Sequence, residues 1–261
     1  MSIPERPRVA FVLAGTDHGT MIVNRLDWYE KEDGGAIGVG LALLNNGSYA
    51  ATETRFLAEL LTGLRETRGD GVVALDIGAN IGTFTIAWAQ HMEGWGEVIA
   101  IEPQERVFYA LAGNIALNNC FNARAILAAC GAPGRDEEAV PRLDYRAPLN
   151  SGGLSLRAGA HNKPGQPVDW GIVDRVTAVT IDMIAKKASL IKIDVEGMEP
   201  EVLAGASATI KCERPIIFAE YTICGEQAIR DALPGYRFLP AGMDMLAMPE
   251  GDPLWDRIKI G

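Results

Sequence analysis

Carboxylates that directly follow apolar runs are the residues of this sequence best placed to do chemistry. Asp76, Glu102 and Asp194 have this position, and Glu196 lies two residues after Asp194. In open sheets of parallel strands, ligands bind outside the carboxyl ends of the strands. A carboxylate there can act as a general base, accept hydrogen bonds from a substrate or bind a divalent cation. We therefore expect one edge of a sheet to carry these side chains together.

A turn containing glycine follows the first of these carboxylates, in the sequence DIGANIG at residues 76–82. It is built from Gly78, Ala79, Asn80 and Gly82, and it separates an apolar run from a helical pattern. Gly78 can take backbone angles closed to other residues, and the helix presents unpaired N–H groups. Such a turn suits a polar, nucleotide-like ligand. Asn80 replaces the central glycine of the GxGxxG pattern, which weighs against a pyrophosphate.

Glu102 lies where sheets that bind nucleotides hold a ribose, roughly 20 residues beyond the turn. It ends the apolar run 98–101 and precedes Pro103. Its carboxylate can accept two hydrogen bonds from a 2′,3′-diol. A solvated carboxylate without a ligand is the alternative, and the preceding turn favours the ribose.

Asp194 and Glu196 are the candidate catalytic residues. They follow the run 190–193, with Gly197 breaking the strand and Pro200 suited to the first turn of a helix. Because the end of a central strand is the expected place for chemistry, Asp194 is the stronger candidate of the two.

Two neighbouring residues leave the interpretation of this site open. Glu220 ends the run 216–219 and has a comparable position. Lys192 shares a strand face with Asp194, so a structural ion pair is the alternative to a catalytic role. We assign no residue as a metal ligand.

The elements that must position these residues alternate between strands and helices. Strands are predicted at 72–75, 98–101, 124–130, 190–193, 216–219, 236–239 and 243–248. Helices are predicted at 52–64, 83–90 and 227–233, and after Glu102 with a buried stripe of Phe108, Leu111, Ala112, Ile115 and Ala116. Ala128 and Ala129 end the third strand, where the base of a nucleotide could lie against them. The pattern predicts an α/β fold with an antiparallel ending.

Two segments lie outside this regular pattern. Residues 1–70 are expected to form an N-terminal extension, with a hairpin of strands 9–13 and 20–24, and residues 71–261 the main domain. Glycines and prolines recur in residues 131–173, which we interpret as a substrate-side loop with a short hairpin around 154–156. In the extension, His18 is interpreted as capping a turn and Asp27 as solvated, with substrate contact as the alternative.

The composition excludes several classes of protein. A net charge of -10 and a pI near 4.9 argue against a nucleic-acid groove, which needs a basic surface. No apolar run approaches the roughly 18 residues that span a bilayer. The cysteines, Cys120, Cys130, Cys212 and Cys224, are scattered and form no CxxC pair, as expected for reduced thiols in a cytoplasmic protein.

Four motifs together carry a resemblance to a known family. They are DIGANIG at 76–82, IEP at 101–103, LIKIDVEGME at 190–199 followed by EVLAGA, and the pairs Arg214-Pro215 and Ala219-Glu220. The region from about Gly71 to Tyr221 resembles the FkbM-type S-adenosylmethionine-dependent methyltransferases. The resemblance implies a Rossmann-like, seven-stranded, mostly parallel sheet with a reversed final strand, helices on both faces and the cofactor over the carboxyl ends.

The resemblance also implies roles for particular residues. Asp76, Gly78, Asn80 and Gly82 would line S-adenosyl-L-methionine, Glu102 would hold its ribose, and Asp194 with Glu196 would lie near the transferred methyl. The expected reaction is methyl transfer to a hydroxyl oxygen of a small-molecule or saccharide acceptor.

Two alternatives to this function remain. A nicotinamide-dependent oxidoreductase shares the first strand, the glycine turn and the acidic strand end, although the antiparallel ending counts against it. A cofactor-binding module without activity is the other, since a fold alone does not prove catalysis.

Overall fold

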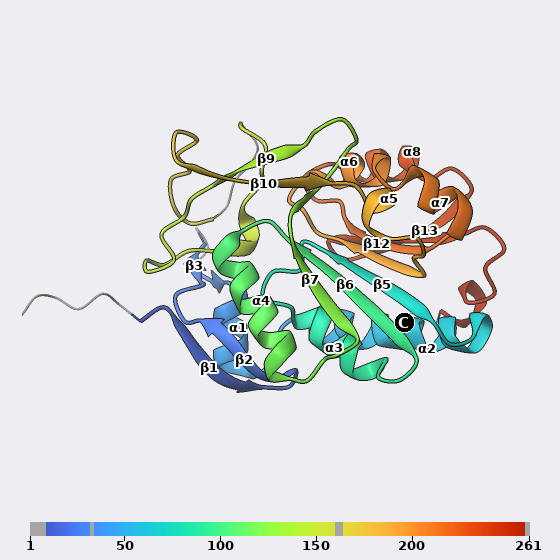
Figure 1. Ribbon diagram of the computed structural model, residues 1–261, viewed down its shortest axis with the longest axis horizontal. Coiled ribbons are helices and arrows are strands. Elements are labelled where there is room, and N and C mark those ends of the chain that lie inside the picture. The colour runs from blue at the N-terminus through green and yellow to red at the C-terminus, as the bar shows by residue number, and fades with distance from the viewer. Residues whose placement is uncertain (1–8, 32–33, 160–163, 259–261) are drawn as a thin grey trace, which may run out of the picture.

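A seven-stranded, mostly parallel sheet forms the centre of the molecule (Figure 1). The computed structural model describes residues 9–31, 34–159 and 164–258. The order of strands is β13 (Tyr236–Ala241), β14 (Asp244–Pro249), β12 (Ile216–Glu220), β11 (Leu190–Ile193), β5 (Val72–Ile77), β6 (Gly96–Glu102) and β7 (Ala123–Leu127). β14 is the last strand along the chain and runs antiparallel to both β12 and β13. The expected α/β class with a reversed final strand is confirmed.

The central strands are apolar on both faces because helices cover both. β11 has the sequence LIKI and is buried throughout, as is usual for parallel strands between two helical layers. Asp76 is the charged residue of β5 and Lys192 that of β11, and these two residues are register partners in adjacent strands. A buried acid and a buried base are thus placed side by side at the middle of the sheet.

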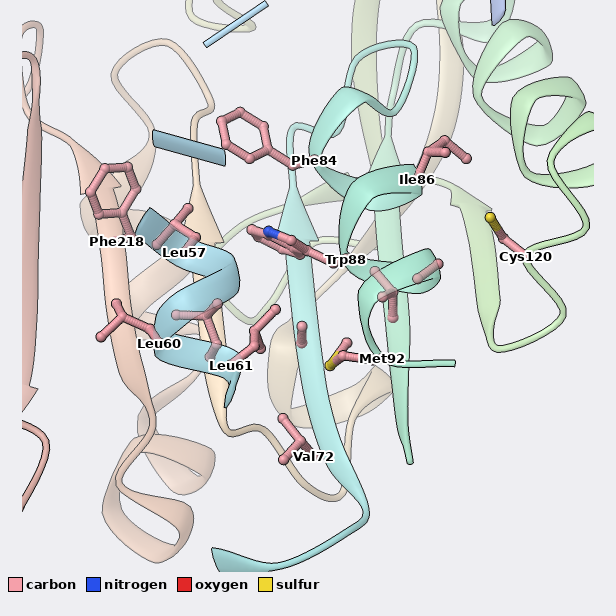
Figure 2. Close-up of a cluster of buried hydrophobic side chains, with 14 of the residues drawn as sticks. Leu57, Leu60, Leu61, Val72, Phe84, Ile86, Trp88, Met92, Cys120 and Phe218 are labelled. Carbon is pink, nitrogen blue, oxygen red and sulfur yellow. The ribbon is translucent and has the colours of Figure 1, made fainter. Parts of the chain in front are cut away.

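One face of the sheet is covered by α2 (Ala51–Arg68), α3 (Thr83–His91) and α4 (Glu105–Leu117). α2 buries Leu57, Leu60, Leu61 and Leu64 at helical spacing, and Figure 2 shows the first three beside Trp88 of α3 and Phe218 of β12. Burying one such side chain stabilises the folded state by about 1.5–3 kcal/mol.

The opposite face is covered by short helices. They are α5 (Ile181–Ile184), α6 (Glu199–Ala204), α7 (Ser207–Glu213) and α8 (Glu226–Ala232). Residues from α5, α6 and α8 form one buried cluster with Leu75, Ile77, Ile191 and Ile193 of the sheet. Of the helices within the described residues, none is long and apolar enough to cross a bilayer.

The N-terminal segment forms the expected hairpin, which packs on α4. β1 (Phe11–Thr16) and β2 (Gly19–Asn24) pair antiparallel, followed by β3 (Tyr29–Glu30), β4 (Ala36–Ile37) and α1 (Val39–Asn46). Asn114 of α4 bonds the N–H and C=O of Ile22, and Asn118 does the same for Thr20. Residues 1–8 of the expected N-terminal unit lie outside the described residues.

The predicted buried stripe of α4 is partly wrong. Its buried residues are Val107, Ala110, Leu111 and Asn114. The stripe is rotated because α4 packs against β2 as well as the sheet, and Asn114 forms part of that contact.

The third strand and the segment after it also differ from the prediction. The strand ends at Leu127, and β8 (Ala129–Cys130) joins β10 (Val173–Val179) and β9 (Glu137–Pro141) in a small separate sheet, drawn near the top of Figure 1. The predicted hairpin around 154–156 is wrong: a 3-10 turn spans Ser151–Gly153, and Leu154 and Leu156 are buried in a cluster with Leu149. Residues 160–163 of this segment lie outside the described residues.

Candidate active site

The carboxyl ends of β5 and β11 carry a charged group of three side chains. Lys192 Nζ lies 3.1 Å from Asp194 Oδ2, 3.8 Å from Asp76 Oδ1 and 4.9 Å from the centre of the Phe84 ring. Although burial disfavours the charged form of Lys192, the carboxylates of Asp194 and Asp76 outweigh it and raise the lysine pKa. The Asp194 side chain remains 40% exposed, so it can reach a substrate while Lys192 fixes its position.

Asp76 is fully buried beneath this group. Its Oδ2 accepts a 2.6 Å hydrogen bond from Thr85 Oγ1 of α3. Burial is the largest influence on its pKa and raises it, and nearby Lys192 opposes this change. Its Oδ1 is buried and accepts no hydrogen bond within the described residues.

The glycine turn is shaped by contact between two strand ends. A Cβ on Gly78 would lie 1.8 Å from the carbonyl oxygen of Asp194, and the φ angle of Gly78 is +79°. The N–H groups of Gly78 and Ala79 both donate to the Ile101 carbonyl at 3.0 Å. Glycine is therefore needed at position 78 for the packing of β5 against the loop after β11, whether or not a ligand approaches it.

The remainder of the turn leads into α3. Asn80 has a φ angle of +50°, and Gly82 one of +91°. A Cβ on Gly82 would lie 2.6 Å from Leu111 Cδ1 of α4, so helix packing also favours glycine there.

Glu102 is buried at the end of β6, and the alternative of a solvated carboxylate is wrong. Its Oε2 accepts from Asn80 N–H at 3.0 Å and its Oε1 from Gln104 N–H at 2.8 Å. Burial raises the pKa of Glu102 to about 7, against the opposing effect of these two hydrogen bonds. The predicted turn and the predicted ribose carboxylate are thus joined directly.

Asp194, Glu196 and Glu220 form a carboxylate cluster. One oxygen of each lies within 4.8 Å of the others. Burial and the nearby charge of Asp194 raise the pKa of Glu220 to about 7. Three carboxylate oxygens are ligands that a divalent cation accepts, although exposed acidic groups often lie this close without one. The structure brings both predicted catalytic residues to the edge that carries the turn and Glu102.

The loop between β11 and α6 is held by Glu199. Its Oε1 accepts hydrogen bonds from Val195 N–H and Gly197 N–H, both at 3.1 Å. Glu196 has a φ angle of +53° and Gly197 one of +97°. A non-glycine residue with positive φ is uncommon, and such strain concentrates at functional sites.

Ala129 lies in the small sheet. It pairs with Ala178 of β10, is 3% exposed and packs in a cluster with Val140 and Met198. The main-sheet strand ends at Leu127, three residues earlier than predicted, so Ala129 extends no main-sheet strand. Its contact with a nucleotide base stays a prediction.

Sequence reasoning missed two contributions from the N-terminal segment. Asp27 is 2% exposed and bonds Ser151 and Gly40, so its interpretation as solvated is wrong. Burial raises the pKa of Tyr49, and the nearby charge of Asp194 raises it further. Neither residue stands in a local motif, and their partners are distant in sequence. His18 is also buried, and its backbone N–H donates to Thr16 Oγ1.

A cavity of about 830 Å³ lies away from this site, at the amino ends of β5 and β6. It is bordered by Gly71, Trp95 and Gly96, and it contains none of the candidate residues. Asn122 in its wall already donates to the carbonyls of Ala89 and Gly96. Asn122 thus serves local structure, and this cavity lies at the sheet edge opposite to the predicted site residues.

The strand order, the reversed β14, the turn after β5 and the acidic end of β6 define a Rossmann-like α/β fold. The family model described as Methyltransferase FkbM domain matches residues 76–238, more than half of the chain. The chain belongs to the FkbM methyltransferase family.

Solved structures of other methyltransferases resemble the chain distantly. A methyltransferase FkbM from Methylobacillus flagellatus is 17% identical, with a TM-score of 0.45, covering 69% of this chain and 44% of its own. Magnesium protoporphyrin IX methyltransferase from Synechocystis PCC 6803, solved with bound SAM, is 12% identical, with a TM-score of 0.43. The match covers 76% of this chain and 79% of that one.

A third structure, precorrin-6y C5,15-methyltransferase from Geobacter metallireducens, is 14% identical, with a TM-score of 0.43 over 76% of this chain and 88% of its own. The chain spans less than half the length of the first of the three. No curated protein matches the chain. These likenesses are too distant to assign a substrate.

Proposed function

We propose that this protein transfers the methyl group of S-adenosylmethionine to a hydroxyl oxygen of a small-molecule or saccharide acceptor. The observation that supports this most is the meeting of three strand ends: the turn after β5, Glu102 of β6 and Asp194 after β11 lie at one edge. Family membership supports methyl transfer, and a hydroxyl acceptor is our extension of it.

The residues present fit a nucleoside with a charged side chain. Each oxygen of Glu102 accepts one backbone N–H and keeps further capacity to accept from a ribose diol. Asp76 Oδ1 is a buried acceptor without a hydrogen bond in the described part of the chain. Asp76, Gly78, Ala79, Asn80, Gly82 and Glu102 would hold the cofactor, which supplies an activated methyl group on a sulfonium.

Asp194 is the proposed general base. A hydroxyl becomes an effective nucleophile when its proton is removed, and a carboxylate within hydrogen-bond reach can take it. Lys192 holds Asp194 Oδ2 at 3.1 Å and so orients the carboxylate towards the acceptor. Glu196 and Glu220 would bind acceptor hydroxyls beside it. The main task of the site is to align the two reactants and exclude water.

Calorimetric titration of the full chain with S-adenosylhomocysteine and, separately, with NAD tests the class of cofactor. We expect saturable binding of S-adenosylhomocysteine and none of NAD, because the turn lacks the glycine pattern that receives a pyrophosphate. Binding of NAD alone would overturn the proposal. Binding of S-adenosylhomocysteine without methylation of any component of a cell extract would favour a module without activity.

The affinity for S-adenosylhomocysteine is expected to rise with pH around neutrality. The pKa of Glu102 is about 7, and a ribose diol donates hydrogen bonds, which favours the ionised carboxylate. Glu102 is mostly protonated at one unit below its pKa and mostly ionised at one unit above it. We therefore expect about tenfold tighter binding at the higher pH, measured by calorimetry.

Two variants separate Glu102 from its titrating neighbours. Glu102→Gln should bind S-adenosylhomocysteine weakly at every pH. The carboxylate accepts hydrogen bonds from two backbone N–H groups, and in the variant the amide NH2 would have to face one of these donors. Glu220→Gln removes the other carboxylate with a pKa of about 7 and should keep the pH dependence. If Glu220→Gln abolished the pH dependence, Glu102 would not be its source.

A further inference from the structure

Asp27 is a buried carboxylate that joins the N-terminal segment to the Ser151–Gly153 turn. Its Oδ1 accepts from Ser151 N–H at 2.9 Å and Ser151 Oγ at 3.2 Å, and its Oδ2 accepts from Gly40 N–H at 3.1 Å. Ser151 lies 124 residues further along the chain. A buried carboxylate is stable only when such donors satisfy it, so these bonds fix both partners.

The backbone around Asp27 leaves it little freedom to move. A Cβ on Gly38 would lie 2.2 Å from the Asp27 carbonyl oxygen, and one on Gly40 would lie 2.9 Å from Asp27 Cβ. Leu149 N–H donates to the Leu26 carbonyl at 3.0 Å, beside the contact with Ser151. The N-terminal segment therefore presents Asp27 as a rigid anchor for the turn.

The other side of the turn reaches the proposed cofactor site. The Ser151 carbonyl accepts from Gln104 Nε2 at 2.8 Å, and the Gln104 N–H donates to Glu102. A Cβ on Gly152 would lie 3.3 Å from Asn80 Nδ2, so the turn lies against the glycine turn itself. The hydroxyl of Tyr145 donates to Gln104 Oε1 at 3.0 Å and completes the support of that amide.

We propose that Asp27 is a positioning residue for cofactor binding. It holds the Ser151–Gly153 turn, which through Gln104 fixes the carboxylate of Glu102. This inference rests on the proposed function, because it assumes that Glu102 binds the ribose. It also assigns part of the site to a segment that precedes the matched family domain at residues 76–238.

Titration of Asp27→Ala with S-adenosylhomocysteine tests the inference. The substitution leaves Gly40 N–H and both donors of Ser151 without their acceptor, and the turn loses its anchor. We expect binding to weaken about tenfold or more, the loss caused by misaligning one hydrogen bond to a charged group. Asp182→Ala is the matched control, since Asp182 likewise accepts two backbone N–H groups and one hydroxyl, from Ala208 and Thr209.

A second variant distinguishes positioning from general loss of structure. Gln104→Leu removes the side-chain bonds to Ser151 and Tyr145 and keeps the backbone bond to Glu102. If Asp27 acts through the turn, the double variant should bind no more weakly than the weaker single variant, whereas independent effects would multiply. Ser151→Ala, which keeps the Ser151 N–H bond, should lose affinity only a few-fold and serves if Asp27→Ala does not fold.

The outcomes separate this inference from the function on which it rests. Wild-type affinity in Asp27→Ala, an equal loss in Asp182→Ala, or multiplying losses in the double variant would each overturn the role of Asp27 alone. If Asp27→Ala does not fold and Ser151→Ala is used in its place, wild-type affinity in Ser151→Ala or in Gln104→Leu would also overturn the role of Asp27. Absence of S-adenosylhomocysteine binding by the wild-type chain would overturn the proposed function and this inference with it.

Discussion

Asp194→Asn is expected to lower the rate of methyl transfer by about 10²–10⁴-fold, the usual contribution of a general base. Asparagine keeps an oxygen for Lys192 Nζ, which lies 3.1 Å from Asp194 Oδ2, so the loop should keep its position. It cannot take a proton from an acceptor hydroxyl. The rate is measured as transfer of labelled methyl from S-adenosylmethionine into a cell-extract fraction, and calorimetry checks that S-adenosylhomocysteine still binds.

The matched control is Asp231→Asn on α8. Asp231 is exposed and accepts a hydrogen bond from Gln227, one helical turn earlier. The Asp231→Asn variant should transfer methyl at the wild-type rate. An unchanged rate in Asp194→Asn with intact cofactor binding would show that Asp194 is not the base. Glu220, with its pKa raised to about 7, would then be the next candidate.

Gly78→Ala is expected to destabilise the folded chain by roughly 3 kcal/mol or more, the sum of backbone strain and overpacking. The new Cβ would lie 1.8 Å from the carbonyl oxygen of Asp194, and the φ angle of +79° disfavours any L side chain. Relief requires β5 and the loop after β11 to move apart. Urea unfolding followed by circular dichroism measures the free energy of unfolding.

Gly71→Ala isolates the contact from the backbone angle. Gly71 has a φ angle of +90°, and nothing lies within 4 Å of its added Cβ. Gly71→Ala should therefore lower the free energy of unfolding by the backbone strain alone, about 1–2 kcal/mol. Equal destabilisation in the two variants would mean that the contact between Gly78 and Asp194 is not tight.

The main sheet and most of the candidate site could be predicted because their signals are local. The turn at 76–82 and the carboxylates that end β6 and β11 each stand beside a short apolar strand. In parallel strands, such ends must meet at one edge. The contacts between Asn80 and Glu102 and between Lys192 and Asp194 follow from that geometry.

The rest of the site depends on contacts between distant parts of the chain. Asp27 is buried by Ser151, and no spacing in the sequence links the two. The segment 131–173 has no periodic pattern, yet β9 pairs with β10 and forms a small sheet. Ala129 was predicted at the end of the third strand because a run of small apolar residues gives no signal of the point at which a strand changes sheet.

The amides of α4 have a consequence for how this protein meets other copies of itself. The outer edge of a strand offers unpaired N–H and C=O groups that can template aggregation with another chain. Along β2, Asn114 and Asn118 occupy these groups at Ile22 and Thr20. Two asparagines on a helix thus close this edge of the hairpin to strand addition from a neighbouring molecule.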